Sequence, residues 1–223
     1  MNKRTVFIIC LLVALVPGIY LAFVWSSLPA IIPTHWGVGN KPDGWGSKNT
    51  LLGILAIPGV LGLLTSLLML NLDKLDPKRG KHISVAVRNK LAISIMVFMT
   101  AICIYIIYVT QSQAHEMGNF IFLLIGLLFA FLGNLMYSIK QNYFVGFRLP
   151  WTLDNEENWN RSNRLMSKLF FASGVLIVIS SLILPSIPVM IITFGSILIS
   201  TAYTIIFSYR LFRKQQAENK LQS

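Results

Sequence analysis

The sequence predicts an all-α, polytopic membrane protein: a bundle of six transmembrane helices that forms a single domain over residues 1–223. Hydrophobic residues make up 55% of the chain and charged residues only 12%, whereas about 25% of the residues of an average soluble domain are charged. The polar residues are also gathered into short blocks between apolar runs of about twenty residues. A water-soluble domain is therefore disfavoured.

Six apolar segments predict the helices. We expect them at residues 5–25, 50–72, 91–110, 120–138, 167–184 and 187–209, and at about 1.5 Å per residue each can cross an apolar layer of about 30 Å. The first segment runs unbroken to Trp25, which favours a retained helix over a cleaved signal peptide. The short connection between Pro185 and Pro188 predicts an antiparallel hairpin of the last two helices.

Two further features indicate helix packing rather than chemistry. Ser196, Ser200 and Thr204 recur every four residues in the last segment, and small residues at this spacing let membrane helices approach closely. Cys10 and Cys103 each lie inside an apolar run, so we expect buried thiols rather than a disulfide or a metal pair.

The placement of charge predicts the orientation. The formal net charge is +11, and all but two of the 19 lysines and arginines, Lys41 and Lys48, fall in connections that share one side with both termini. The positive-inside rule therefore predicts that both termini are cytoplasmic. Because this basic excess would face anionic lipid, we expect the lipid bilayer as a partner and no direct contact with nucleic acid.

The predicted helix interiors contain few polar side chains that could bind a substrate or catalyse a reaction. No charged residue or histidine lies in the middle of a segment, which disfavours an ion-coupled transporter, although a broken helix that binds through backbone carbonyls stays open. Asn134 is the best interior polar residue, and we expect it to form a hydrogen bond between helices. His115-Glu116 lacks the second histidine of a helical zinc site, and no nucleophile-elbow or phosphate-loop motif occurs. We therefore predict no enzyme, no catalytic residue, no metal site and no cofactor.

The predicted outer loop, residues 26–49, is too specific in composition for a simple linker. Pro42-Asp43-Gly44 predicts a turn, because proline presets φ and glycine accepts positive φ, and we expect a compact loop. His35, Trp36 and Trp45 could then form an aromatic face for an apolar or peptide ligand. Anchoring of the same side chains at the outer lipid headgroups is an equal alternative.

The predicted inner region, residues 133–168, contains a second specific connection. Asp154 and Glu157 have the spacing of a capping box, so we expect a short helix to begin at Asp154. Trp159, Ser162 and either Leu165 or Met166 share one face of that helix. This pattern predicts an amphipathic helix that lies in the membrane interface, with the tryptophan at the acyl boundary.

These two connections carry a resemblance to known families. The loop from Leu28 to Lys48 resembles a short domain of bacterial membrane proteins, the domain of unknown function 1648. The inner region resembles the signature of the SdpI-type immunity proteins. The residues that carry the second resemblance are Asn134, Lys140, Asn142, Gly146, Arg148, Pro150, Trp151, Thr152, Trp159, Asn163 and Arg164.

The resemblance implies a multi-pass protein of the bacterial plasma membrane that protects its cell against a secreted, membrane-active toxin peptide. It also implies signalling, in which the toxin-bound protein holds a cytoplasmic winged-helix repressor at the membrane. By analogy His35, Trp36, Asp43 and Trp45 would meet the toxin. The inner signature residues would meet the repressor or hold the helices in register.

Two other functions remain as alternatives. One is a transporter or permease-like protein for a small amphiphile, which a substrate-dependent flux in proteoliposomes would support. The other is a membrane enzyme that acts on lipid or cell-wall precursors and uses His35 and Asp43 at the outer surface.

Overall fold

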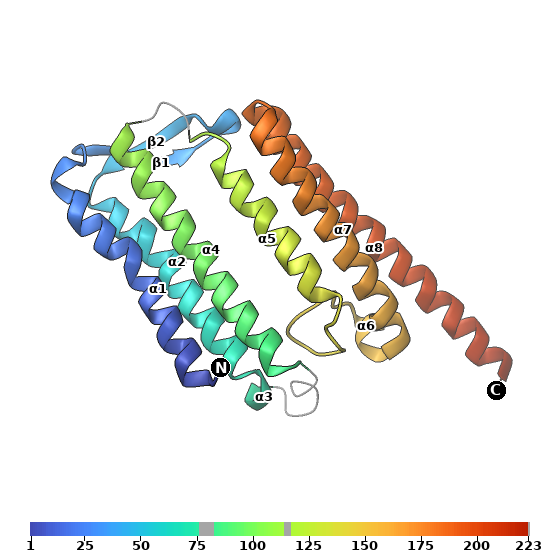
Figure 1. The fold of residues 1–223 in the computed structure, drawn as a ribbon. Coiled ribbons are helices and arrows are strands. Elements are labelled where there is room, and N and C mark those ends of the chain that lie inside the picture. Colours follow the sequence, from blue (N-terminus) through green and yellow to red (C-terminus); the bar gives the residue numbers. More distant parts are fainter. Residues whose placement is uncertain (76–82, 114–116, 223) are drawn as a thin grey trace.

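The computed structural model describes residues 1–75, 83–113 and 117–222, and for residues 219–222 it describes the backbone alone. Six long helices dominate (Figure 1): α1 (Lys3–Val24), α2 (Thr50–Leu70), α4 (Val85–Ser112), α5 (Phe120–Met136), α7 (Glu156–Ile183) and α8 (Ser186–Gln222). The short elements are η1 (Trp25–Ser27), β1 (Ile31–Trp36), η2 (Val38–Asn40), β2 (Pro42–Ser47), α3 (Leu72–Leu75) and α6 (Pro150–Asp154).

The predicted membrane bundle is confirmed. Five of these helices are long and apolar enough to cross a membrane, and α5 is a shorter apolar helix of 17 residues. Three helices extend beyond the predicted spans: α4 begins at Val85, α7 begins at Glu156 and α8 continues to Gln222. Hydropathy predicts where a helix crosses lipid, whereas its polar ends are stabilised by backbone hydrogen bonds that hydropathy does not detect.

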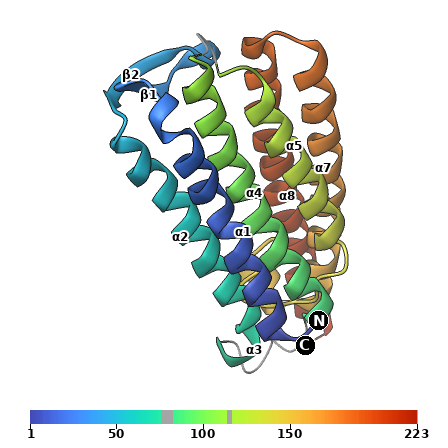
Figure 2. The same cartoon turned by 60° about the vertical axis from the view of Figure 1, so that its left-hand side comes forward.

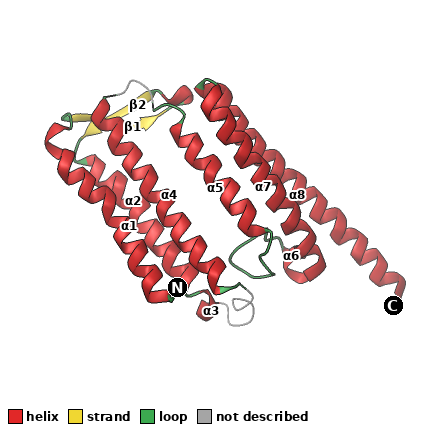
Figure 3. Cartoon of the chain, viewed as in Figure 1, coloured by secondary structure: helices red, strands yellow, loops and turns green. Residues whose placement is uncertain are grey.

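The bundle consists of two groups of three helices. In both views α1, α2 and α4 lie together and α5, α7 and α8 lie together, with α4 beside α5 between them (Figures 1 and 2). We call the end with both termini, α3 and α6 the inner end, and the end with β1 and β2 the outer end. The strands are confined to the outer end (Figure 3). Both termini at one end is what an even number of membrane crossings requires; the cytoplasmic orientation stays a prediction.

The closest helix contact joins α5 and α7, and glycines allow it. A Cβ atom on Gly174 would lie 2.3 Å from the backbone nitrogen of Ala130, and one on Gly133 would lie 2.5 Å from the backbone nitrogen of Phe171. No larger residue fits without separating the two backbones. Close backbone approach through small residues is a general device of membrane helices, which have no hydrophobic force between them.

The Gly174→Ala variant should therefore lose α5–α7 packing. We expect it to be destabilised by about 1–3 kcal/mol, because the added methyl group meets backbone atoms that cannot rotate away. The matched control is Gly195→Ala in α8, where an added Cβ has no atom within 4 Å. The midpoint of thermal unfolding in detergent measures both. Equal midpoints for the two variants would contradict the packing assignment.

The small-residue stripe of α8 packs against α7, in agreement with the packing role predicted for it. Ser200 and Thr204 are buried, and the Ser200 hydroxyl lies 3.0 Å from the hydroxyl of Ser173 in α7. Cys10 and Cys103 are free and buried, so their predicted packing role also agrees with the structure.

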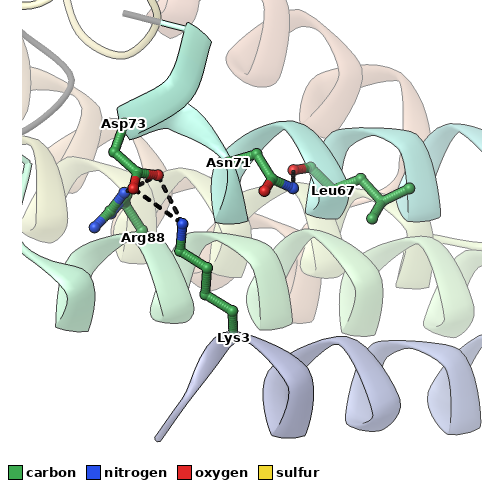
Figure 4. A network of polar contacts seen from close by, with 5 residues as sticks. All are labelled: Lys3, Leu67, Asn71, Asp73 and Arg88. Atoms are coloured by element: carbon green, nitrogen blue, oxygen red, sulfur yellow. Dashed lines mark hydrogen bonds and ion pairs between the residues drawn. The ribbon is translucent and has the colours of Figure 1, made fainter. Parts of the chain in front are cut away.

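At the inner end an ionic cluster joins the α1, α2 and α4 group (Figure 4). One carboxylate oxygen of Asp73, in α3, accepts from the Lys3 ammonium at 2.7 Å and from the Arg88 guanidinium at 2.9 Å. The Arg88 side chain is only 8% exposed, so it depends on this acid for its charge compensation. Asn71 ends α2 nearby by donating its side-chain amide to the carbonyl of Leu67 at 2.9 Å.

The cluster predicts a pH-dependent stability. The hydrogen bond from Lys3, aided by the charges of Lys3 and Arg88, holds the pKa of Asp73 below its ordinary value. A carboxyl group whose pKa is depressed by folding contributes stability that is fully present above its unfolded pKa and is lost as the pH falls through its folded pKa. Wild-type stability should therefore fall as the pH decreases below the ordinary aspartate pKa of about 3.9.

Asp73→Asn should reproduce this loss at neutral pH. It leaves the buried Arg88 without its counter-charge, and we expect a cost of about 1–3 kcal/mol and a weaker acid dependence below about pH 4. The exposed Asp154 supplies the control, Asp154→Asn, which should leave the midpoint unchanged. Thermal unfolding across this pH range is the measurement, and an Asp73→Asn midpoint equal to the wild type at neutral pH would refute the role of the cluster.

Candidate functional site

The outer loop forms a β-hairpin. Strands β1 and β2 are antiparallel, with Pro33 opposite Trp45. Gly39 and Asn40 take the positive φ values that the tight turn needs, 77° and 62°. The predicted turn at 42–44 is therefore wrong: these residues lie in β2, because a glycine and an asparagine, which both accept positive φ, precede them and supply the turn.

The hairpin is fixed to the bundle at its base and at its tip. Ile32 is fully buried in a cluster with side chains of α2 and α4. At the tip Asn40 donates its side-chain amide to the carbonyl of Gly118 at 2.7 Å, and its own carbonyl accepts from the backbone nitrogen of Met117 at 2.8 Å. The turn at Gly39 also lies against Ile187 at the start of α8. The outer loop is therefore compact and contacts both helix groups.

The structure separates the four predicted toxin-contact residues into three environments. The Nδ1 atom of His35 lies 2.5 Å from a carboxylate oxygen of Asp43, and both side chains are exposed. Trp36 is half-buried and packs against the core cluster below the hairpin. Trp45 is 62% exposed. These side chains therefore do not form the single aromatic face that the sequence suggested.

An open groove lies beside Trp45. Its volume is about 460 Å³, and it is lined by Pro29, Ile31, Pro33, Lys41, Pro42, Trp45, Thr110 and Gln113. Apolar rings and aliphatic groups supply most of its surface, and one lysine lies in the lining. Such a groove suits an apolar or aromatic side chain of a peptide, with polar groups at the edge that can bind the peptide backbone.

The inner signature is a densely hydrogen-bonded loop, and Asn142 organises its first half. Asn142 is fully buried. Its side-chain oxygen accepts from the backbone nitrogens of Phe144 at 2.8 Å and Val145 at 2.7 Å, while its amide group donates to the carbonyls of Lys140 and Val145. One asparagine thus satisfies four backbone groups in a segment that has no regular secondary structure.

Trp159 and Asn163 fix this loop to α7. The Trp159 indole is fully buried and donates to the carbonyl of Ile139 at 3.0 Å. Asn163 donates to the carbonyl of Met136 at 2.6 Å and accepts from the backbone nitrogen of Phe147. Gly146 has a φ of +121°, and an added Cβ would lie 2.7 Å from the Trp159 ring. The loop therefore needs a glycine at this position.

The second half of the loop connects to α8. Pro150 begins α6, and the buried Thr152 hydroxyl accepts from the backbone nitrogen of Leu149 at 2.9 Å. The Trp151 indole donates to the hydroxyl of Ser208 in α8 at 3.0 Å. The buried residues of the signature therefore connect the inner loop to α7 and α8 through hydrogen bonds, while the role of these residues stays a prediction.

The predicted amphipathic helix is wrong in two respects. Asp154 ends α6, and the cap of α7 is Asn155, whose side-chain oxygen accepts from the backbone nitrogen of Asn158 at 2.8 Å. The helix then continues through the membrane-spanning segment without a break. Trp159 faces the protein interior rather than the acyl boundary, because the Ile139 carbonyl satisfies its indole there.

Asn134 also differs from its prediction. It is exposed on the surface of α5, and its neighbour Gly133 is the residue that faces α7. Hydropathy places both residues in the same apolar segment but does not determine which one faces a neighbouring helix.

Three cations of the signature are exposed at the inner end: Lys140, Arg148 and Arg164. The Arg148 guanidinium donates to the carbonyl of Tyr143 at 2.6 Å, and the Arg164 guanidinium lies 5.4 Å from the centre of the Tyr137 ring. His115-Glu116 lies outside the described residues. In the described part of the chain there is no group of three or more metal-ligating side chains.

Sequence reasoning missed Asn158 and Ser208. Asn158 is fully buried and donates its amide to the backbone carbonyl of Ser208 at 3.0 Å, and Ser208 also receives the Trp151 indole. Ser208 continues the four-residue period of Ser200 and Thr204, so extending that stripe by one step would have found it.

The fold and this site define a helical membrane protein with a rigid outer hairpin and a folded inner loop. The SdpI/YfhL protein family matches residues 138–208, and the domain of unknown function DUF1648 matches residues 12–62. The chain is 28% identical over 215 residues to the Immunity protein SdpI of Bacillus subtilis (strain 168). These residues cover 96% of this chain and 98% of that protein. No solved structure matches the chain. The chain therefore resembles the SdpI/YfhL family over these residues, as its motifs predicted.

Proposed function

We propose that this chain is an immunity protein of the bacterial plasma membrane that protects its cell against a secreted, membrane-active toxin peptide. The observation that carries the proposal is the similarity over 96% of the chain to a protein named for immunity. Both family matches support it, since one includes the outer hairpin and the other includes most of the inner loop. The similarity thus includes the outer hairpin and the inner loop, which lie outside the membrane-spanning helices.

The groove beside Trp45 is the proposed toxin-binding site. It opens at the outer end of the bundle, where a secreted peptide would arrive. Trp45 offers a large exposed ring opposite Pro33, and the hairpin below it is held by the buried Ile32. A rigid aromatic anchor loses little conformational entropy on binding, which favours recognition of an apolar peptide. The exposed His35–Asp43 pair supplies polar contacts on the same hairpin.

At the inner end, Lys140 and Arg148 are the proposed contacts for a cytoplasmic repressor. Both are exposed, whereas Asn142, Thr152 and Trp159 are buried. The exposed cations would recognise an acidic surface. In a reporter strain, Lys140→Gln with Arg148→Gln should abolish toxin-dependent transcription while protection is retained. Unchanged transcription would refute this contact without affecting the immunity proposal.

The test of immunity uses a toxin-sensitive bacterium that lacks an immunity protein of its own. It expresses this chain or an empty vector and is challenged with culture supernatant from the bacterium that carries the chain. We expect the expressing cells to keep their membrane potential and survive, while control cells depolarise and die. Equal killing, with the chain shown by immunoblot to be in the membrane, would refute the proposal.

A further inference from the structure

A second groove, at the inner end between α5 and α7, has a different character from the outer one. Its volume is about 240 Å³, and it is lined by Gly133, Asn134, Tyr137, Ser167, Lys168 and Phe171. Asn134, Tyr137 and Lys168 are all exposed, so the groove opens on the side of the bundle rather than into its core. Polar and ionic groups therefore line an opening between two apolar helices.

Two cations beside this groove have no acidic partner. Arg164 lies over the Tyr137 ring at 5.4 Å, and Lys168 follows it one helical turn later on the same face of α7. Neither forms an ion pair within the described residues, whereas Arg161 pairs with Glu157 at 2.8 Å. The groove thus carries two positive charges whose counter-charge is not supplied by the described residues.

The position of the groove along the helix axes places it at the level of the lipid headgroups. Lys168 is the last charged residue of α7, and the next charged residue along the chain is Arg210 in α8. On the other wall, α5 carries no charged residue from Phe120 to Met136. The groove therefore lies at the boundary between the polar inner end and the apolar part of both helices, where lipid phosphates are found.

We propose that this groove binds the phosphate of an anionic phospholipid, with its acyl chains along the apolar surfaces of α5 and α7. Arg164 and Lys168 supply the charge, and the exposed Asn134 amide and Tyr137 hydroxyl have no hydrogen-bond partner among the described residues and can donate to the phosphate. Basic pockets between membrane helices on the cytoplasmic side bind such headgroups in general. The apolar Phe171 side chain, which is 48% exposed, continues the groove toward the acyl region. This binding is independent of any toxin or repressor.

Native mass spectrometry of the purified full chain tests the proposal. The protein is released from micelles that contain equal amounts of phosphatidylglycerol, cardiolipin and phosphatidylcholine. We expect the wild type to retain the anionic lipids over phosphatidylcholine. Arg164→Gln with Lys168→Gln should lower that retention by about tenfold, because two phosphate contacts are lost. The matched control is Arg210→Gln with Arg213→Gln, which removes two exposed cations of α8 and should leave retention unchanged.

Each outcome is decisive. Equal retention by the groove variant and the wild type, or equal loss in the two double variants, would overturn the proposal, since retention would then not depend on this site. An excess of inorganic phosphate should leave the lipid bound; complete displacement would show a site for free phosphate and would also overturn it. Thermal unfolding in detergent verifies that both double variants are folded.

Discussion

Replacement of Trp45 by alanine is expected to abolish protection against the toxin while the amount of protein in the membrane stays at the wild-type level. Trp45 is 62% exposed and lines the outer groove, so its loss removes contact surface without opening the core. Buried aromatic anchors of an interface contribute about 2 kcal/mol or more, which corresponds to roughly 30-fold weaker binding. Survival and membrane potential under toxin challenge measure the effect, with an immunoblot of membranes for abundance.

Trp36→Ala serves as the contrasting variant. Trp36 is half-buried against the core cluster below the same hairpin, so its truncation should reduce the amount of folded protein together with protection. If Trp45→Ala cells survived as well as wild-type cells, the groove would not be the toxin site. A parallel loss of abundance and protection in Trp45→Ala would instead assign that residue a structural role.

The second large effect is expected for Gly146→Ala, which should destabilise the chain by about 2–5 kcal/mol. The φ of +121° at Gly146 is strained for any residue with a Cβ atom. The new methyl group would also lie 2.7 Å from the Trp159 ring, which is fully buried and fixed by its bond to Ile139. The inner loop would have to separate from α7.

Membrane abundance and the midpoint of thermal unfolding measure this effect. The control is Gly59→Ala in α2, where an added Cβ has no atom within 4 Å and alanine favours the helix. We expect Gly59→Ala to be neutral or slightly stabilised. A wild-type midpoint for Gly146→Ala would mean that the loop adapts at little cost and does not hold the helices in register.

The sequence predicted the bundle because lipid allows few solutions. A backbone in hydrocarbon must satisfy its own hydrogen bonds, so a run of about twenty apolar residues indicates a helix with little ambiguity. The hairpin was not predicted. Its strands, Ile31–Trp36 and Pro42–Ser47, contain two prolines and two glycines, which are rare in strands, and the pairing depends on contacts with α2 and α4.

The candidate site was predicted only in part, because burial is a tertiary property. The signature around Asn142 and Trp159 was found by its residues, yet nothing local shows that both side chains are fully buried. Trp159 was expected at the membrane interface and Asn134 between helices. In the structure Trp159 is buried inside the protein and Asn134 is exposed on the surface of α5. A polar side chain within one turn of a helix end satisfies either pattern, so only the position of the neighbouring helix distinguishes them.

One consequence of α8 concerns the communication between the two faces of the bundle. The helix has 37 residues, Ser186–Gln222, and is therefore about 55 Å long. At its outer start Ile187 lies against the hairpin turn, and further along Ser208 receives the Trp151 indole of the inner loop. The hairpin tip and the inner loop thus contact the same rigid rod. A tilt of α8 would therefore move its contact with the hairpin turn and its contact with the inner loop together.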